Sequence, residues 1–261
     1  MHVLLPPSEG KTAGGRGRPL RRRLAGDAAD PLSVARARAV QALQELVAGD
    51  PAVAARALLL PDGVAPAALA ADAAVLDSPT RPALQRYAGV VYAGLDYANL
   101  SAAEQRTAGR CCLVFSGLFG AVGGDEPVPD YRVPAKAVLP GLGIAGTFWR
   151  PVLDDVLPAR LGRGLVVDLR SSDYAAMWRP RGDLAARVIT VRVLSPAPRG
   201  GHAVISYNSK FAKGRLAAEL IRRAARKEKV ATPDDVAAAW LAWDGAADVR
   251  PTAHGFDLYT R

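Results

Sequence analysis

Two lysines, Lys210 and Lys213, stand three residues apart in the segment 204–214, a spacing that suits the binding of an anion. The segment, VISYNSKFAKG, starts as an apolar run that predicts a buried strand, and apolar residues then recur at helical spacing. With Asn208 or Ser209 as the N-cap, both lysines fall in the first turn, where the helix dipole disfavours a cation by about 0.3–1 kcal/mol. The pattern therefore indicates a phosphate or carboxylate held between the two ammonium groups and the free backbone N–H groups.

The glycine that follows, Gly214, would allow such an anion, or another backbone, to approach closely. The competing interpretation is that Lys210 and Lys213 are ordinary solvated charges, which contribute little. The two interpretations differ in whether other polar groups converge on the lysines.

Polar residues follow two other predicted strands, Val3–Leu5 and Leu165–Leu169, in the same way. In open α/β sheets, ligands bind beyond the carboxyl ends of the strands, where helix N-termini also point. We therefore expect the three strand exits to converge on one cationic, hydroxyl-rich cleft. The polar residues at these exits are Ser8, Lys11 and Thr12, then Asp168, Arg170, Ser171, Ser172, Asp173 and Tyr174, and finally Ser206, Tyr207, Asn208, Lys210 and Lys213.

Three of these side chains, Lys11, Lys210 and Asp168, are the candidates for catalysis. Crowded lysines can have lowered pKa values and act as bases or nucleophiles. Asp168 would be a general base or an orienting carboxylate, or else a buried aspartate that caps a loop. Two standard motifs do not fit, because Gly10-Lys11-Thr12 lacks the first glycine and the following helix of a P-loop, and Ser116 lies in VFSGL rather than Gly-x-Ser-x-Gly.

Tyr131 and Arg132 form a further pair that suits an anion or a nucleic-acid base. The tyrosine ring would stack on the ligand, and the guanidinium would clamp its negative charge. A packing tyrosine beside a surface arginine is the alternative.

The net charge of +9 favours a polyanionic partner such as nucleic acid. Only six of the 34 basic residues are lysines, however, and the chain is rich in Ala, Gly and Pro, so part of the arginine content reflects a GC-rich composition. Two clusters concentrate the charge. The first cluster lies in an early loop, which is either solvated or a phosphate-contacting arm, and consists of Arg16, Arg18, Arg21, Arg22 and Arg23. The second lies at the C-terminus of a predicted helix, where cations complement the helix dipole, and consists of Arg222, Arg223, Arg226, Lys227 and Lys229.

Cys111 and Cys112 lie within the apolar run CCLVF. Neighbouring residues of a strand point to opposite faces, so this pair is poorly placed to bond or to chelate a metal, and we expect two buried small hydrophobes. A redox-sensing thiol is the alternative, and it would need exposure and a lowered pKa. The histidines at 2, 202 and 254 show no ligand spacing, so we predict no metal site and no cofactor.

The elements that position these residues alternate between strands and helices, which predicts an α/β (α+β) fold with a mixed sheet flanked by helices. We expect one domain over 1–261 with a helical insertion at about 32–110. The expected helices lie at 33–47, 51–59, 79–91, 147–157 and 233–241, and further helices are expected to start near 101, 171 and 208. The other expected strands lie at 111–115, 188–194, 202–206 and 255–259. We expect residues 120–143 to form a long loop.

The stretch 84–111 has the outline of a helix-hairpin-helix. A helix leads to a turn with Gly94 and Leu95, and Ser101 with Glu104 then predicts a capping box for a second helix. Such a hairpin can offer backbone N–H groups to DNA phosphates. Two helices joined by a glycine turn also occur in many folds that do not bind DNA.

No apolar run approaches the roughly 20 residues of a membrane span, and the N-terminal sequence shows no signal peptide. We therefore expect a cytoplasmic protein without a membrane partner.

Taken together, the motifs resemble those of the YaaA family (also grouped as UPF0246), bacterial proteins associated with resistance to peroxide stress. The matching segments follow the family's order from residue 3 to about 214. They are VLLPPSEGKT at 3–12, VYAGL at 91–95, FSGLFG at 115–120, Tyr131-Arg132, Phe148-Trp149, 168–174 and 205–214. The chain departs from the pattern after Gly120, where many relatives carry Arg-Pro, and after Arg132, where Glu-Met-Gly is common.

The resemblance implies an α/β fold with a mixed sheet, a helix-hairpin-helix and a positively charged cleft. It also implies DNA binding and a role in limiting oxidative damage, through the lowering of available iron. The family positions matched in this sequence are Lys11, Arg132, Ser172, Lys210, Lys213 and Gly214.

We therefore expect a protein that binds duplex DNA without sequence specificity through a cationic cleft. The anion- or DNA-binding residues of this hypothesis are Ser8, Lys11, Tyr131, Arg132, Arg170, Ser171, Ser172, Tyr207, Asn208, Lys210, Lys213 and Gly214. One alternative is an enzyme that acts on a small anionic or nucleotide-like molecule in the same cleft, and another is a scaffold whose basic surface aids association. A deep pocket favours the enzyme, whereas an open groove wide enough for a duplex favours DNA.

Overall fold

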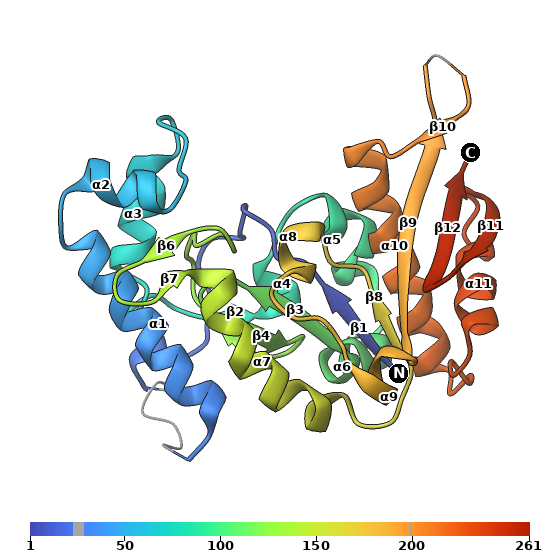
Figure 1. Cartoon of the computed structure of the whole chain (residues 1–261), viewed down its shortest axis with the longest axis horizontal. Helices are drawn as coiled ribbons and strands as arrows, with labels where there is room; N and C mark the ends of the chain where they lie inside the picture. The colour runs from blue at the N-terminus through green and yellow to red at the C-terminus, as the bar shows by residue number, and fades with distance from the viewer. Residues whose placement is uncertain (23–28, 199) are drawn as a thin grey trace.

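The structure, a computed structural model, describes residues 1–22, 29–198 and 200–261, and its centre is an eight-stranded mixed sheet (Figure 1). The strands are β1 (His2–Leu5), β3 (Cys112–Ser116), β4 (Gly120–Gly123), β8 (Val166–Asp168), β9 (Val188–Pro196), β10 (His202–Ala203), β11 (Ala246–Thr252) and β12 (Gly255–Thr260). Seven of them follow the order β11-β12-β9-β8-β1-β3-β4, and β10 pairs with the end of β9. The expected α/β class with a mixed sheet is confirmed.

The middle of the sheet is parallel and buried. β1 pairs with β3 on one side and with β8 on the other, so Leu4 lies opposite both Leu113 and Asp168. Val3, Leu4 and Leu5 have no exposed surface, as expected for a parallel strand that is covered on both faces. Because the three strands run in the same direction, the chain leaves β1 and β8 at the same edge of the sheet.

Helices gather at the two ends of the molecule as well as over the sheet (Figure 1). They are α1 (Pro31–Val47), α2 (Pro51–Ala57), α3 (Ala65–Ala73), α4 (Ala83–Arg86), α5 (Val90–Leu95), α6 (Ala102–Cys111), α7 (Ala145–Leu161), α8 (Ser172–Ala175), α9 (Gly182–Ala185), α10 (Ser206–Ala225) and α11 (Pro233–Leu241). Helices α1 to α6 lie between β1 and β3 in the chain; their treatment as an insertion at about 32–110 in a single domain stays a prediction. None of the described helices combines the length and the apolar character needed to cross a lipid bilayer.

Two expected elements are wrong because strand-like backbone pairing occurs within both of them. The helix expected at 79–91 breaks between α4 and α5, because residues 86–88 pair with residues 10–12 of the loop after β1. The loop expected at 120–143 contains β4 and three short strands. These are β5 (Pro127–Val128), β6 (Val138–Leu139) and β7 (Gly143–Ile144).

The start of α10 also differs from the expectation. The helix begins at Ser206, after Ile205, and no side chain caps it, so an N-cap at Asn208 or Ser209 is wrong. The expected hairpin is confirmed, because β9 and β10 are antiparallel. The prediction of a buried strand over residues 202–206 is wrong, since β10 is two residues long and Val204 is 57% exposed.

Helices α5 and α10 cross with their backbones in contact. A Cβ atom at Gly214 would lie 2.0 Å from the carbonyl oxygen of Val91, and one at Gly94 would lie 2.1 Å from that of Phe211. The approach of another backbone, one of the two roles considered for Gly214, is therefore confirmed. The helix-hairpin-helix character of α5 and α6 stays a prediction, and α5 itself has six residues and ends at Asp96 in the left-handed conformation.

The two cysteines lie at the junction of a helix and a strand. Cys111 ends α6 and Cys112 begins β3, and this change of backbone direction brings the two Sγ atoms to 4.0 Å. The expectation that the side chains of Cys111 and Cys112 point to opposite faces is thus wrong, because it assumed that both residues lie in a strand. Their burial is confirmed.

Candidate functional site

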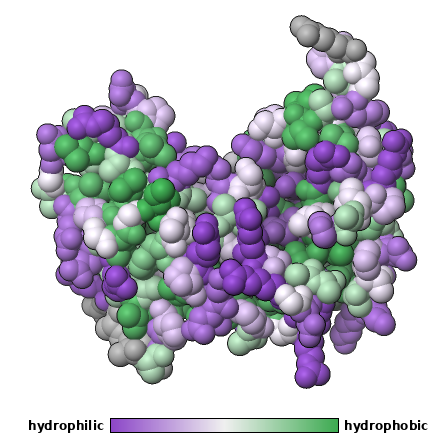
Figure 2. Space-filling model, viewed as in Figure 1, coloured by the Kyte–Doolittle hydropathy of each residue, from purple (hydrophilic) through white to green (hydrophobic). Residues whose placement is uncertain are grey.

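The three predicted strand exits meet around one pocket. Its volume is about 670 Å³, and its walls come from the loop after β1, the start of α5, the loop after β8 and one face of α10. The polar lining residues are Ser8, Glu9, Ser171, Ser172, Asp173, Tyr174, Ser206, Ser209, Lys210 and Lys213. Figure 2 shows that this side of the molecule is hollowed between the end that carries α2 and α3 and the end that carries α10, with hydrophilic residues in the hollow.

One face of α10 supplies both lysines of the pocket. Ser206, Ser209, Lys210 and Lys213 follow one another at intervals of three, one and three residues, and all four line the pocket. Because α10 begins at Ser206, the lysines lie in its second and third turns rather than in the first. The backbone N–H groups of the first turn have no partners within the helix, so an anion near Ser206 would meet them before it meets the ammonium groups.

The two lysines are held differently. Lys213 donates hydrogen bonds from Nζ to the carbonyl oxygens of Leu169 (3.3 Å) and Arg170 (3.2 Å), which tie α10 to the exit of β8. Burial lowers the pKa of Lys213 from its ordinary value. Lys210 is exposed and forms no ion pair with any residue that the structure describes. The ammonium group of Lys210 is thus available to a ligand.

The two carboxylates of the pocket are each neutralised by a cation. Glu9 lies 3.2 Å from the guanidinium of Arg132, and Asp173 lies 2.8 Å from the ammonium group of Lys136. The charges of the lysines on α10 are therefore not cancelled by these acids. Lys210 is therefore the exposed cation, among the described residues of the pocket lining, whose charge these two acids leave unpaired.

Serine hydroxyls line the pocket on the sides that face α10. Ser8 donates to the carbonyl oxygen of Gly10 at 2.6 Å, which shapes the loop after β1. Ser171 precedes α8 and Ser172 begins it, but neither hydroxyl caps that short helix. The hydroxyls of Ser171 and Ser172 can donate to an anion or accept from a neutral ligand group, whereas that of Ser8, whose proton is donated to Gly10, can only accept.

Arg170 and Asp168 belong to the core rather than to the pocket, which corrects their place among the expected site residues. Arg170 donates to both carboxylate oxygens of Asp168, at 2.8 and 2.6 Å, and to the carbonyl oxygens of Tyr174 and Trp178. Its guanidinium carbon also lies 4.2 Å from the centre of the Phe115 ring. Four of the five N–H donors of Arg170 are thus occupied inside the protein, and its side chain is buried. The buried loop-capping role considered for Asp168 fits the structure.

Lys11 lies behind the pocket wall, on a buried tyrosine. Its Nζ atom is 4.3 Å from the centre of the Tyr131 ring and donates to the carbonyl oxygens of Ser8 (3.2 Å) and Glu9 (3.4 Å). Burial lowers the pKa of Lys11 to about 8. The Tyr131 hydroxyl bonds to Ser116 Oγ at 2.6 Å. Tyr131 therefore packs inside the protein, and its expected stacking on a ligand is wrong.

Asp72 is a buried acid that no sequence pattern singles out, because it lies in the alanine-rich helix α3. Its Oδ1 atom accepts from the backbone N–H of Arg132 at 2.7 Å, and Oδ2 has no hydrogen-bond partner among the described residues. Burial raises the pKa of Asp72 to about 7. The nearby positive charge of Lys11 acts in the opposite direction.

Tyr207 and Asn208 point away from the pocket. They line a separate cavity of about 220 Å³ with Phe211, Trp243 and the chain around Thr260. Their place among the residues of the lysine pocket is therefore wrong, because at about 100° per residue they lie about 100° and 200° around the helix from Ser206.

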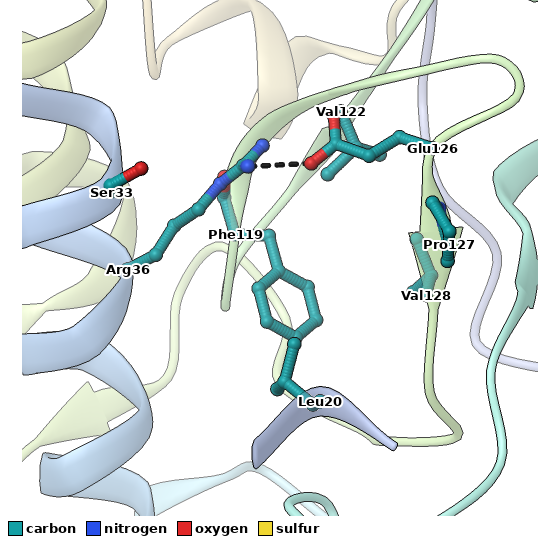
Figure 3. Close-up of a pocket in the computed structure, with 8 residues that line it drawn as sticks. All are labelled: Leu20, Ser33, Arg36, Phe119, Val122, Glu126, Pro127 and Val128. Atoms are coloured by element: carbon teal, nitrogen blue, oxygen red, sulfur yellow. Dashed lines mark hydrogen bonds and ion pairs between the residues drawn. The ribbon is translucent and has the colours of Figure 1, made fainter. Parts of the chain in front are cut away.

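A smaller cavity of about 120 Å³ lies between α1 and the strands β4 and β5 (Figure 3). Arg36 crosses it and meets Glu126 at 2.5 Å, and the same guanidinium donates to the carbonyl oxygens of Phe119 and Ala121. The other carboxylate oxygen of Glu126 accepts from the N–H of Gly123 at 3.0 Å. These polar groups hold β4 in place and leave little for a ligand.

Within the described parts of the chain, no three His, Cys, Asp or Glu side chains gather as a metal site would require. Arg16, Arg18 and Arg21 of the early cluster are exposed, and Arg21 pairs with Asp77 at 2.7 Å. Arg23 lies outside the described residues.

Fold and pocket together define an α/β protein with a lysine-bearing pocket at the carboxyl ends of its parallel strands. The chain belongs to the family described as peroxide stress protein YaaA, whose model matches residues 1–239. A UPF0246 protein of Streptomyces coelicolor is 45% identical over 222 residues, which are 85% of this chain and 83% of that protein. A UPF0246 protein of Corynebacterium efficiens is 34% identical over 224 residues, which are 83% of this chain and 83% of that protein. A UPF0246 protein of Porphyromonas gingivalis is 33% identical over 156 residues, which are 58% of this chain and 60% of that protein. The resemblance to this family is confirmed.

Proposed function

We propose that this protein serves the peroxide-stress response by binding a small anionic or nucleotide-like molecule in the pocket between β1, β8 and α10. The observation that carries the proposal is the pair of lysines on one face of α10, opposite carboxylates that are already neutralised. An anion there would accept from Lys210 and from the N–H groups of the first turn of α10.

The dimensions of the pocket also support a small ligand. Its volume of about 670 Å³ falls within the range of roughly 300–1,000 Å³ that is usual for small-molecule sites.

Calorimetric titration with adenosine monophosphate and with inorganic phosphate tests this proposal. We expect Lys210→Ala to weaken the binding of either probe by at least about tenfold, since a charge-assisted hydrogen bond contributes roughly 1.5–3 kcal/mol. Lys229→Ala, which removes an exposed lysine beyond the far end of α10, is the matched control. Equal affinities of wild type and Lys210→Ala, or no binding of either probe, would overturn the proposal.

Sequence-independent binding of duplex DNA is the second candidate. It is supported by the net charge of +9 and by the exposure of Lys210, Arg16 and Arg18 on the surface. DNA binding of this kind weakens steeply with salt, because each neutralised phosphate releases counterions. A Lys210→Ala/Lys213→Ala variant with a flatter salt slope than wild type would support contact of DNA with the pocket rim.

An unchanged slope in that double variant would count against contact at the rim and move the DNA to the arginine clusters. Absence of duplex binding near physiological salt would exclude the second candidate. Neither result alters the calorimetric test of the small anion, so the two candidates are judged separately.

A further inference from the structure

The sulfur atoms of Cys111 and Cys112 form a reactive cluster apart from the pocket. We propose that these two cysteines are an oxidation site for hydrogen peroxide, which converts their thiols into a disulfide between neighbouring residues. The chain contains two cysteines in all, so an intramolecular disulfide can join only this pair.

The geometry of the junction between α6 and β3 brings the sulfurs together. Their Sγ atoms lie 4.0 Å apart, which is within the hydrogen-bond range of sulfur. A disulfide bond is about 2.05 Å long, so the sulfurs must approach by about another 2 Å. Neighbouring Cα atoms are about 3.8 Å apart, closer than the roughly 4.4–6.8 Å of ordinary disulfides. The closed ring would be strained and readily reduced by thiols, as a reversible site requires.

The two thiols differ in access, and this assigns their roles. Cys111 keeps 7% of its surface exposed, whereas Cys112 has none. Hydrogen peroxide is little larger than water, so the first attack occurs at Cys111. Cys112 lies within β3 and is placed to attack the oxidised sulfur from inside.

The electrostatics agree with this assignment. The hydrogen bond from the Cys112 thiol lowers the pKa of Cys111, and the positive charge of Arg110 acts in the same direction. The same hydrogen bond, together with burial, raises the pKa of Cys112 well above its ordinary value. The thiolate, which is the form that reacts with peroxide, therefore belongs to Cys111.

The chemistry balances in two steps. The Cys111 thiolate attacks one oxygen of hydrogen peroxide, the O–O bond breaks, and hydroxide leaves as Cys111 becomes a sulfenic acid. The Cys112 sulfur then attacks the sulfenic sulfur, so that the S–S bond forms and the S–O bond breaks. The thiol proton and the hydroxyl group leave as water, and the hydroxide of the first step takes up a solvent proton. Two thiols are oxidised by two electrons, and one peroxide is reduced to two waters.

The test treats the reduced full-length protein with graded hydrogen peroxide. The protein is then unfolded, its free thiols are alkylated with N-ethylmaleimide, and its intact mass is measured. We expect wild type to lose two hydrogens and take up no N-ethylmaleimide, and dithiothreitol to restore both thiols. Retention of both thiols, at a dose that oxidises the same chain in urea, would overturn the proposal. Conversion to sulfinic acid without a disulfide, or disulfide-linked dimers, would overturn it as well.

Single substitutions separate the two roles. In Cys112→Ser the sulfenic acid of Cys111 should persist and react with dimedone, because the second step is removed. In Cys111→Ser the loss of the remaining thiol should be slower by at least about tenfold. Equal rates in the two variants would contradict the assigned roles. Cys111→Ala and Cys112→Ala repeat the comparison if a serine hydroxyl in the core impairs folding.

Discussion

Gly94 of α5 and Gly214 of α10 face each other across the helix crossing, and neither position has room for a side chain. The crossing sets the position of the face of α10 that carries Lys210 and Lys213. The close packing of these two glycines therefore determines the width of the pocket.

Gly214→Ala should destabilise the protein and weaken ligand binding together. Its Cβ atom would lie 2.0 Å from the carbonyl oxygen of Val91, which is backbone and cannot turn away. Overpacking of this kind costs about 1–3 kcal/mol or more, which exceeds the roughly 1 kcal/mol that alanine gains over glycine within a helix. Urea unfolding measures the change. Gly63→Ala is the control, because a Cβ there meets nothing within 4 Å, and unchanged stability of Gly214→Ala would contradict the close crossing.

Asp72 should make stability fall as the pH rises. Burial raises its pKa from the ordinary 3.8 to about 7, so between these values the folded protein holds a proton that the unfolded chain has lost. The stabilisation is fully present below about pH 4 and is lost as the pH rises through about 7. Each unit of the pKa difference corresponds to about 1.4 kcal/mol.

Asp72→Asn should remove this dependence, since an amide does not titrate in the same range. We expect the free energy of unfolding of Asp72→Asn minus that of wild type to increase by a few kcal/mol between about pH 4 and pH 8, because wild type loses stability over this range and the variant does not. Guanidinium denaturation at the two pH values measures the difference. Asp62→Asn, at an exposed acid, should show no such trend. The same trend in both variants would point to a general effect of net charge.

Arg86 should tolerate no substitution, including lysine. It is 1% exposed and donates to the carbonyl oxygens of Val128 (3.0 Å), Pro79 (2.8 Å) and Thr12. A lysine ammonium cannot reproduce the planar set of donors that reaches all three. We expect Arg86→Lys and Arg86→Met each to lower the Tm, because each buried carbonyl group left without a donor costs about 1–3 kcal/mol. Arg179→Met, at an exposed arginine, is the control and should change the Tm little. A Tm of Arg86→Lys near that of wild type would show that the three carbonyl contacts of Arg86 are not needed for stability.

The buried pair of Asp168 and Arg170 should be structural. Arg170→Met leaves the Asp168 carboxylate uncompensated and should cost about 3–5 kcal/mol of stability. Asp168→Asn/Arg170→Met should recover part of that loss, because the unpaired charge is gone. Urea unfolding of the two variants checks this order. If Asp168→Asn alone kept full stability but lost binding of adenosine monophosphate, Asp168 would belong to the site instead.

The sequence predicted the sheet and the convergence of its strand exits, because buried parallel strands are apolar and their exits are polar. Val3–Leu5 and the capping box of Ser101 show such local signals, and the structure has both. It could not predict which polar residues face the pocket. Arg170 looked like a ligand contact because its carboxylate, carbonyl and aromatic partners become neighbours only after folding.

The sequence also could not predict the contact between the two cysteine sulfurs, the burial of Asp72 or the first residue of α10, since these too depend on the folded structure. A one-residue difference in where a helix ends decides whether neighbouring cysteines face each other, and sequence patterns rarely fix a boundary so closely. Asp72 lies in an alanine-rich helix and becomes unusual only through its burial beside Lys11. The start of α10 at Ser206 turned Tyr207 and Asn208 away from the pocket.

The ion pair of Arg36 and Glu126 has a consequence for the solubility of the protein. β4 is an outermost strand of the sheet, where exposed backbone groups would form a template for a strand from another chain. Arg36 and Arg160 occupy the carbonyl oxygen of Ala121, and Glu126 occupies the N–H of Gly123. These side chains act as a permanent substitute for the missing neighbour, and their loss would open the sheet to self-association.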